Sequence, residues 1–231
     1  MMNSFLDSNV IIAYIFSLDS LHDASKTLIF DSDNNYYSFN VKEEVNRVFA
    51  RKNFEFKTFF SKLMLDMMKL NDVNILGRES LHRSIDNYEA IGNLSNENLH
   101  ESFEKIWNQF DFGENQEVFL VKLKFNDFIN NFESLHRSNR KYLFNKMIFV
   151  SSHDKKDRFL LEKIEEENLE EFLHEEDKNI LFDANEFCKN NLELKLKFVT
   201  ADQDFLKAID ILKNYLCFDE CINLLEFSPN N

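Results

Sequence analysis

Two short apolar segments, one near each end of the chain, stop at a carboxylate and lead into a helix-start pattern. The first is Phe5-Leu6-Asp7, followed by Asn9, and the second runs from Phe198 through Thr200 to Asp202. Such segments predict strands that pass directly into helices. Because the carboxyl ends of parallel strands share one edge of a sheet, where α/β folds place their ligands, we expect these acids to meet there.

Carboxylates held close together repel one another unless a cation lies between them. Hard, all-oxygen ligand sets select Mg²⁺ or Mn²⁺ over Zn²⁺. The three cysteines and six histidines of the chain are scattered and have no zinc-ligand spacing. The sequence therefore predicts a Mg²⁺ or Mn²⁺ site, with further ligands supplied by the chain between the two segments.

The composition sets the class of protein. With 231 residues and 44% hydrophobic content, the chain is long enough for one large domain, and its three glycines and one proline favour long helices. No apolar run of membrane-spanning length and no basic-then-apolar leader is visible, so no membrane contact is expected. These features and the odd cysteine count predict a reduced, cytoplasmic protein.

Strands are expected near residues 4–7, 36–38, 147–150, 196–200 and 221–227, in a short, mostly parallel sheet. Helices are expected near 8–16, 21–30, 41–51, 155–172, 177–190 and 205–214. Between about 53 and 146 the apolar residues recur at helical spacing without any alternating strand pattern. These stripes predict an all-helical core rather than a cofactor pocket.

Two further acids occupy suitable places in this scheme. Glu44 lies early in the helix predicted for 41–51, and Asp177 opens the helix predicted for 177–190. Asp183 is an alternative to Asp177, but we expect it to face solvent or a neighbouring base. Helix capping is the simpler interpretation of Asp7, Asn9 and Asp177 taken singly. Capping alone does not explain why each acid follows a strand end in this order.

The four elements together resemble the PIN-domain ribonucleases. They are Asp7-Ser-Asn9-Val10, the helix carrying Glu44, the helix opened by Asp177, and Thr200-Ala-Asp202-Gln-Asp204-Phe205. The resemblance covers roughly the first 50 and last 60 residues and implies a three-layer α/β/α fold with a short, mostly parallel central sheet. Compact members of the family have a much shorter middle. We therefore predict one PIN-like domain over 1–231, built from 1–52 and 147–231, with an all-helical insertion at 53–146.

The resemblance also implies the roles of these residues. Asp7, Glu44, Asp177 and Asp202 would form the catalytic, metal-binding set, and Asp204 would bind a second ion or support the first. Asn9 and Thr200 would orient the carboxylates. The implied activity is metal-dependent endonucleolytic hydrolysis of single-stranded RNA. The alternatives are a catalytically weak PIN-like protein-interaction module and a nuclease acting on DNA or structured RNA. Implied protein partners are an inhibitor or antitoxin and a second copy of the chain.

The charge of the chain bears on the choice of substrate. The net charge is -14, whereas phosphate contacts by basic residues supply most non-specific affinity for nucleic acid. Residues 134–161 nevertheless hold seven bases against two acids, a local net charge of +5 (seven minus two). The seven are Arg137, Arg140, Lys141, Lys146, Lys155, Lys156 and Arg158. We predict RNA contacts from Arg47, Arg137, Arg140 and Lys141; the alternative is a solvated helix face.

Overall fold

The computed structural model of the chain describes residues 2–69, 75–89, 91–151 and 157–227. It is a mixed α/β structure that divides into two compact units. The sheet unit comprises Met1–Val48 and Asn139–Asn231, and the helical unit comprises Phe49–Ser138. Within the described ranges, no helix is both long and apolar enough to cross a membrane.

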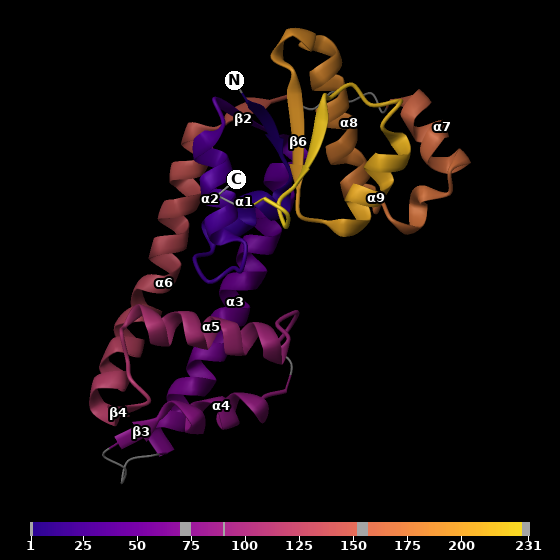
Figure 1. The fold of residues 1–231 in the computed structure, drawn as a ribbon. Helices are drawn as coiled ribbons and strands as arrows, with labels where there is room; N and C mark the ends of the chain where they lie inside the picture. Colours follow the sequence, from indigo (N-terminus) through magenta and orange to yellow (C-terminus); the bar gives the residue numbers. More distant parts are fainter. Residues whose placement is uncertain (1, 70–74, 90, 152–156, 228–231) are drawn as a thin grey trace. The chain divides into compact units, whose positions relative to one another are not determined.

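The sheet unit is built on five strands in the order β5-β2-β1-β6-β7, all paired in parallel (Figure 1). Four strands confirm the expected positions: β1 (Asn3–Leu6), β2 (Asn34–Ser38), β5 (Ile148–Val150) and β6 (Leu196–Thr200). The last strand, β7 (Glu220–Asn223), ends four residues before its predicted limit of 227. It ends there because the side chain and carbonyl of Asn223 accept the amides of Leu225 and Glu226, which closes a turn.

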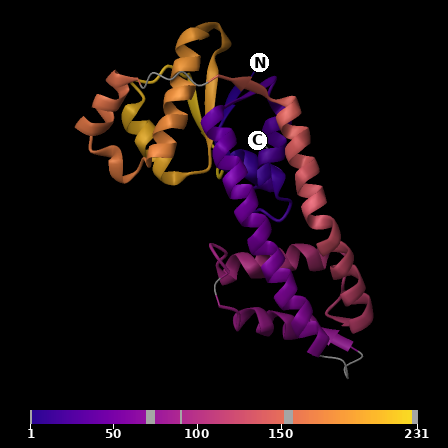
Figure 2. The ribbon, with the colours of Figure 1, turned by 180° about the vertical axis from the view of Figure 1, so that it is seen from behind.

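Helices connect these parallel strands, as parallel topology requires. The helices α1 (Ser8–Ile15) and α2 (His22–Asp31) join β1 to β2. Three others, α7 (Arg158–Glu166), α8 (Glu175–Asn190) and α9 (Gln203–Leu212), belong to the later part of the chain. In both views of the ribbon, α8 and α9 lie on one side of β6 and α1 and α2 on the other (Figures 1 and 2). All four residues of β1 are buried, as expected for a central strand.

Two long helices each contain one of the boundaries between the units. The helix α3 (Phe39–Lys69) is continuous, so the predicted break near residue 52 is wrong; no glycine or proline lies within it to end the helix. The helix α6 (Val118–Lys146) returns to the sheet unit just before β5. The boundaries between units, at 48/49 and 138/139, therefore fall inside helices rather than in linkers.

The helical unit also contains α4 (Arg78–Asp86), α5 (Asn96–Gln109) and two short strands, β3 (Ile75–Gly77) and β4 (Asn115–Glu117). The strands pair antiparallel, so the expectation of an all-helical insertion is wrong at this point. Three residues are too few to show an alternating apolar pattern, which is why no strand was predicted here.

Aromatic side chains form the core of the helical unit. Seven of them are at most 3% exposed: Phe56, Phe59, Phe60, Phe103, Trp107, Phe125 and Phe132. Most of their rings meet edge-on or tilted, as in the Phe56–Phe132 pair, whose centroids are 5.5 Å apart, while Phe56 and Phe60 are stacked. The apolar stripes of the middle segment thus build a packed core rather than a cofactor pocket.

A glycine turn closes over this core and offers a test of its packing. Gly92 has a left-handed φ of +61°, and a Cβ there would overlap the side chain of Glu55, which is 3% exposed and accepts the Asn93 amide. Gly92→Ala should therefore lower the free energy of unfolding by about 2 kcal/mol.

The matched control is Gly113→Ala, whose Cβ would meet only Gln116 Nε2 at 3.4 Å. Urea unfolding should show a change within about 0.5 kcal/mol for the control. Equal losses in the two variants would contradict the packing described for Gly92.

Candidate functional site

The strand register brings the ends of three central strands level. Phe5 pairs with Tyr36 and Leu6 with Val199, so Asp7, the next residue after β1, lies level with Ser38 of β2 and Thr200 of β6. The backbone amide of Asp7 donates to the Val199 carbonyl at 3.0 Å. From β1 the chain continues to β2 on one side, whereas β6 and β7 lie on the other side of β1. In α/β folds a crevice opens at such a switch point.

Asp7 is the centre of a hydrogen-bond network at this edge. Its side chain is buried, and Oδ2 accepts from Thr200 Oγ1 and from Asn9 Nδ2, each at 2.6 Å. Its Oδ1 accepts the Ser8 amide and so caps α1. Asn9 Oδ1 in turn accepts the Ala201 amide at 3.0 Å. Asn9 and Thr200 therefore fix the orientation of Asp7 and join β1 to β6.

Burial is the main reason that the pKa of Asp7 is raised to about 7. The charges of Glu44 and Asp177 raise this pKa further, while the bonds from Thr200 and Ser8 oppose the shift. A carboxyl with this pKa is near its titration midpoint at neutral pH. Charge repulsion, which the sequence argument put first, is thus smaller than desolvation.

Glu44, the sixth residue of α3, is the second acid of the cluster. Its side chain is 20% exposed, and Oε2 is buried without a hydrogen-bond partner in the described part of the chain. Burial raises the pKa of Glu44, the hydroxyl of Ser8 lowers it by donating to the carboxylate, and the charge of Asp177 raises it. Sequence reasoning missed Ser8, although its place between Asp7 and Asn9 was a usable signal.

Asp177 and Asp202 complete the cluster from two helix starts. Asp177 Oδ2 accepts the His174 amide at 3.0 Å, and Asp202 Oδ1 accepts the amides of Asp204 and Phe205. Burial raises the pKa of Asp177, and the charge of Asp202 adds to the rise. Asp7 therefore interacts electrostatically with Glu44 and Asp177, and Asp177 with Asp202.

Three of the clustered acids also cap helices. Asp7, Asp177 and Asp202 each give one oxygen to an amide at a helix start. Among the residues described, Asp177 Oδ1 and Asp202 Oδ2 accept no hydrogen bond, and Glu44 Oε2 is also unpaired. Three of the four acids thus keep an oxygen that another group could use.

Asp204 and Asp183 have other partners. Asp204 is exposed, as Asp202 is, but its carboxylate accepts from Lys207 Nζ at 2.7 Å. Asp183 is buried and accepts from Asn40 Nδ2 at 2.9 Å, so the expectation that it faces solvent is wrong. The reason is that α8 turns this face inward, where Ile180, Leu181 and Ala184 are also buried.

The cluster supplies the oxygen ligands that a hard cation prefers, and the unpaired, buried Oε2 of Glu44 is an atom that such an ion would satisfy. As the side chains lie, no set of three or more histidine, cysteine, aspartate or glutamate residues in the described ranges converges closely enough to hold a metal. The donor chemistry fits Mg²⁺ or Mn²⁺, and direct coordination would require the outer acids to turn toward Asp7.

The bases predicted to contact RNA are already engaged in part. Arg47 forms an ion pair with Glu176 and lies 4.0 Å from Glu44 Oε1. Arg137 pairs with Glu133 on the preceding turn of α6, and Lys141 is exposed on the same helix. Arg140 is half-buried, while Lys155 and Lys156 lie outside the described residues. RNA binding by Arg47, Arg137, Arg140 and Lys141 stays a prediction.

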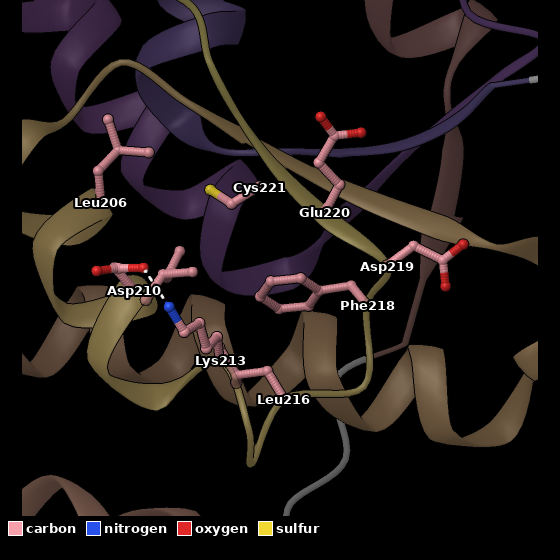
Figure 3. Close-up of a pocket in the computed structure, with 9 residues that line it drawn as sticks. Leu206, Asp210, Lys213, Leu216, Phe218, Asp219, Glu220 and Cys221 are labelled. Atoms are coloured by element: carbon pink, nitrogen blue, oxygen red, sulfur yellow. Dashed lines mark hydrogen bonds and ion pairs between the residues drawn. The ribbon is translucent and has the colours of Figure 1, made fainter.

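A cavity of about 350 Å³ lies elsewhere in the sheet unit, between α9 and β7 (Figure 3). Leu206, Leu216 and Phe218 give it an apolar lining, and the Asp210–Lys213 ion pair lies at its side. None of the predicted acids is among the described residues that line it. The cavity is therefore distinct from the carboxylate cluster.

No family model, curated protein or solved structure matches this chain.

The raised pKa of Asp7 predicts how stability depends on pH in the absence of divalent ions. The folded state keeps this proton up to about pH 7, whereas the unfolded chain loses it near 3.8, so the contribution of Asp7 to stability is lost as the pH rises. We expect the free energy of unfolding to fall by roughly 1–3 kcal/mol between about pH 5 and about pH 7.5.

Asp7→Asn, which cannot ionise, should show a smaller fall, measured by urea unfolding at several pH values. Asp210→Asn, which removes an exposed carboxylate from α9, is the control and should follow the wild type. Parallel pH profiles for wild type and Asp7→Asn would show that Asp7 is not a high-pKa group.

Proposed function

We propose that the protein is a metal-dependent endoribonuclease of the PIN-like type that hydrolyses single-stranded RNA. The observation that supports this most is the buried Asp7 carboxylate at the edge of the parallel sheet. Its pKa is raised by burial and by the neighbouring charges of Glu44 and Asp177. Such an arrangement destabilises the apo protein and is relieved by a bound cation.

Phosphodiester hydrolysis needs a water nucleophile and neutralisation of charge on the phosphoryl oxygens. A bound Mg²⁺ or Mn²⁺ supplies both, because it lowers the pKa of a coordinated water and offsets the negative charge. Asp7 and Asp202 would hold the ion, with Glu44 and Asp177 completing its surroundings. Glu44 Oε2, unpaired and buried, is placed to accept a hydrogen bond from water.

The supporting residues would keep this set in order. Thr200 and Asn9 donate to the same oxygen of Asp7, which leaves little freedom for that carboxylate to rotate. Ser8 donates to Glu44 in the same way. In metal sites, partners of this kind fix the ligand orientation, and their loss costs about 10–100-fold in affinity or activity.

The PIN-like fold and RNA as substrate belong to the proposal as well. The order of the four acidic elements and the parallel sheet with helices on both sides of β6 support them. A phosphate backbone approaching four acids needs nearby bases, and Arg47 is one candidate, since it lies beside Glu44. RNA would compete with Glu176 for this guanidinium.

A protein-interaction module of low activity is the second candidate. Two phenylalanines of the helical unit, Phe54 and Phe119, are 72% and 75% exposed and would offer apolar contacts to a protein partner. The absence of a ready-made metal cage among the described residues also favours it. In this case the acids would serve mainly as helix caps.

The two candidates differ in a cleavage assay. Purified wild type with millimolar Mn²⁺ should cut a mixed-sequence single-stranded RNA, and Asp7→Asn should cut it about 100-fold more slowly or not at all. Thr200→Val, which removes one donor to Asp7, should lose about 10-fold. Asp210→Asn should retain wild-type activity.

Duplex RNA and single-stranded DNA, tested in parallel, distinguish the nuclease alternatives by relative rate. Cleavage by Asp7→Asn at the wild-type rate would overturn the assignment of Asp7 to the site. Failure of the wild type to cut any of these substrates with Mn²⁺ would reject the nuclease and leave the interaction module.

A further inference from the structure

Two histidines of the helical unit face each other across α4 and α5. His82 Nδ1 and His100 Nδ1 are 2.7 Å apart. The ring planes differ by only 22°, and the ring centroids are 5.0 Å apart. This centroid distance is about the sum of the nitrogen–nitrogen distance and the distance from centroid to nitrogen in each ring. The rings are therefore arranged edge to edge, with the two Nδ1 atoms aimed at one another rather than stacked face to face.

The opposite nitrogen of each ring is held by a carboxylate from the other helix. His82 Nε2 bonds to Glu104 of α5, and His100 Nε2 bonds to Asp86 of α4 at 2.8 Å. Each helix thus supplies a histidine and, four residues later, an acid that binds the histidine of its partner helix. Arg78 pairs with Glu104 and with Glu114, and Phe103 packs edge-on against His82.

This arrangement determines where the protons are. A carboxylate can only accept, so both Nε2 atoms carry hydrogen, and a neutral imidazole then has a bare lone pair on Nδ1. Two lone pairs at 2.7 Å repel unless a positive species lies between them. A proton shared between the two nitrogens, or a metal ion, would supply that positive charge.

We propose that His82 and His100 form a binding site for a divalent transition-metal ion of the Zn²⁺ type. Imidazole nitrogen suits Zn²⁺, Cu²⁺ and Ni²⁺, and histidines that bind such ions characteristically donate their other N–H to a carboxylate. Both rings already have this second partner. Their side chains are 26% and 27% exposed, so water can complete the coordination.

Zinc binding requires a local change of geometry at the two rings. Two Zn–N bonds of about 2.0–2.1 Å at a tetrahedral angle place the nitrogens about 3.3 Å apart, an opening of about 0.6 Å, and each ring must also tilt by roughly 35° so that both lone pairs point at the ion. When the ion enters, a proton held between the nitrogens would leave to solvent, and both Nδ1 lone pairs would bind the metal. The site uses nitrogen donors and lies in the helical unit, so it does not depend on the carboxylate cluster or on the proposed nuclease function.

Calorimetric titration of the full-length protein with ZnCl₂, in excess Mg²⁺ to occupy oxygen sites, tests this directly. Wild type should bind one Zn²⁺ at this site, and His82→Gln and His100→Gln should each weaken that binding by about tenfold or more. The double variant should lose no more Zn²⁺ affinity than either single variant does. His22→Gln, which changes a ring on α2 that bonds to the Ala13 carbonyl of α1, should bind as wild type.

Repeating the titration in buffers of different ionisation enthalpy should reveal release of about one proton for each ion bound near neutral pH, as displacement of the shared proton requires. A long-range nitrogen–proton NMR spectrum of the wild type should show Zn²⁺ shifting the Nδ1 signals of two histidines. Because this measurement needs no variant, it tests the site even if a variant fails to fold. Equal Zn²⁺ binding by wild type and double variant, or unshifted histidine Nδ1 signals, would overturn the proposal.

Discussion

The hydrogen bonds to the Asp7 carboxylate are the interaction on which the rest of the sheet unit depends. They join residues that are 193 positions apart in the sequence, since Thr200 Oγ1 donates to Asp7 Oδ2. A buried carboxylate is costly unless donors surround it, and here Ser8, Asn9 and Thr200 supply them. Desolvation still outweighs these donors, because the pKa stays near 7. The same contacts start α1 and bring the end of β6 level with β1.

The sequence predicted the sheet and the acids at its edge for a physical reason. Strands that stop at an acid are visible as apolar runs, and parallel pairing follows from the helices between them. The tertiary partners were not visible: the bond from Ser8 to Glu44 and the burial of Asp183 against Asn40 depend on how helices pack. The uninterrupted α3 and the three-residue strands β3 and β4 were missed because tertiary context, rather than local pattern, determines them.

The two units have different chemical characters. In the sheet unit, acidic side chains lie around the buried Asp7. In the helical unit, two histidine rings face each other through their Nδ1 atoms, and the core is aromatic. Oxygen donors favour Mg²⁺ or Mn²⁺, whereas imidazole favours Zn²⁺ or its neighbours. The same polypeptide therefore has two candidate cation sites that can be tested independently, one from its acidic composition and one from a pair of histidines that no spacing rule identifies.

The central claim is that Asp7, Glu44, Asp177 and Asp202 surround one divalent cation. An anomalous-difference map from a crystal of the wild-type protein grown with MnCl₂ tests it most directly. The account predicts a peak about 2 Å from an Asp7 oxygen, with the Asp202 carboxylate turned toward it and Glu44 Oε2 bound directly or through water. A map without a peak at the edge of the sheet, with Asp7, Asp177 and Asp202 still engaged only as helix caps, would contradict it.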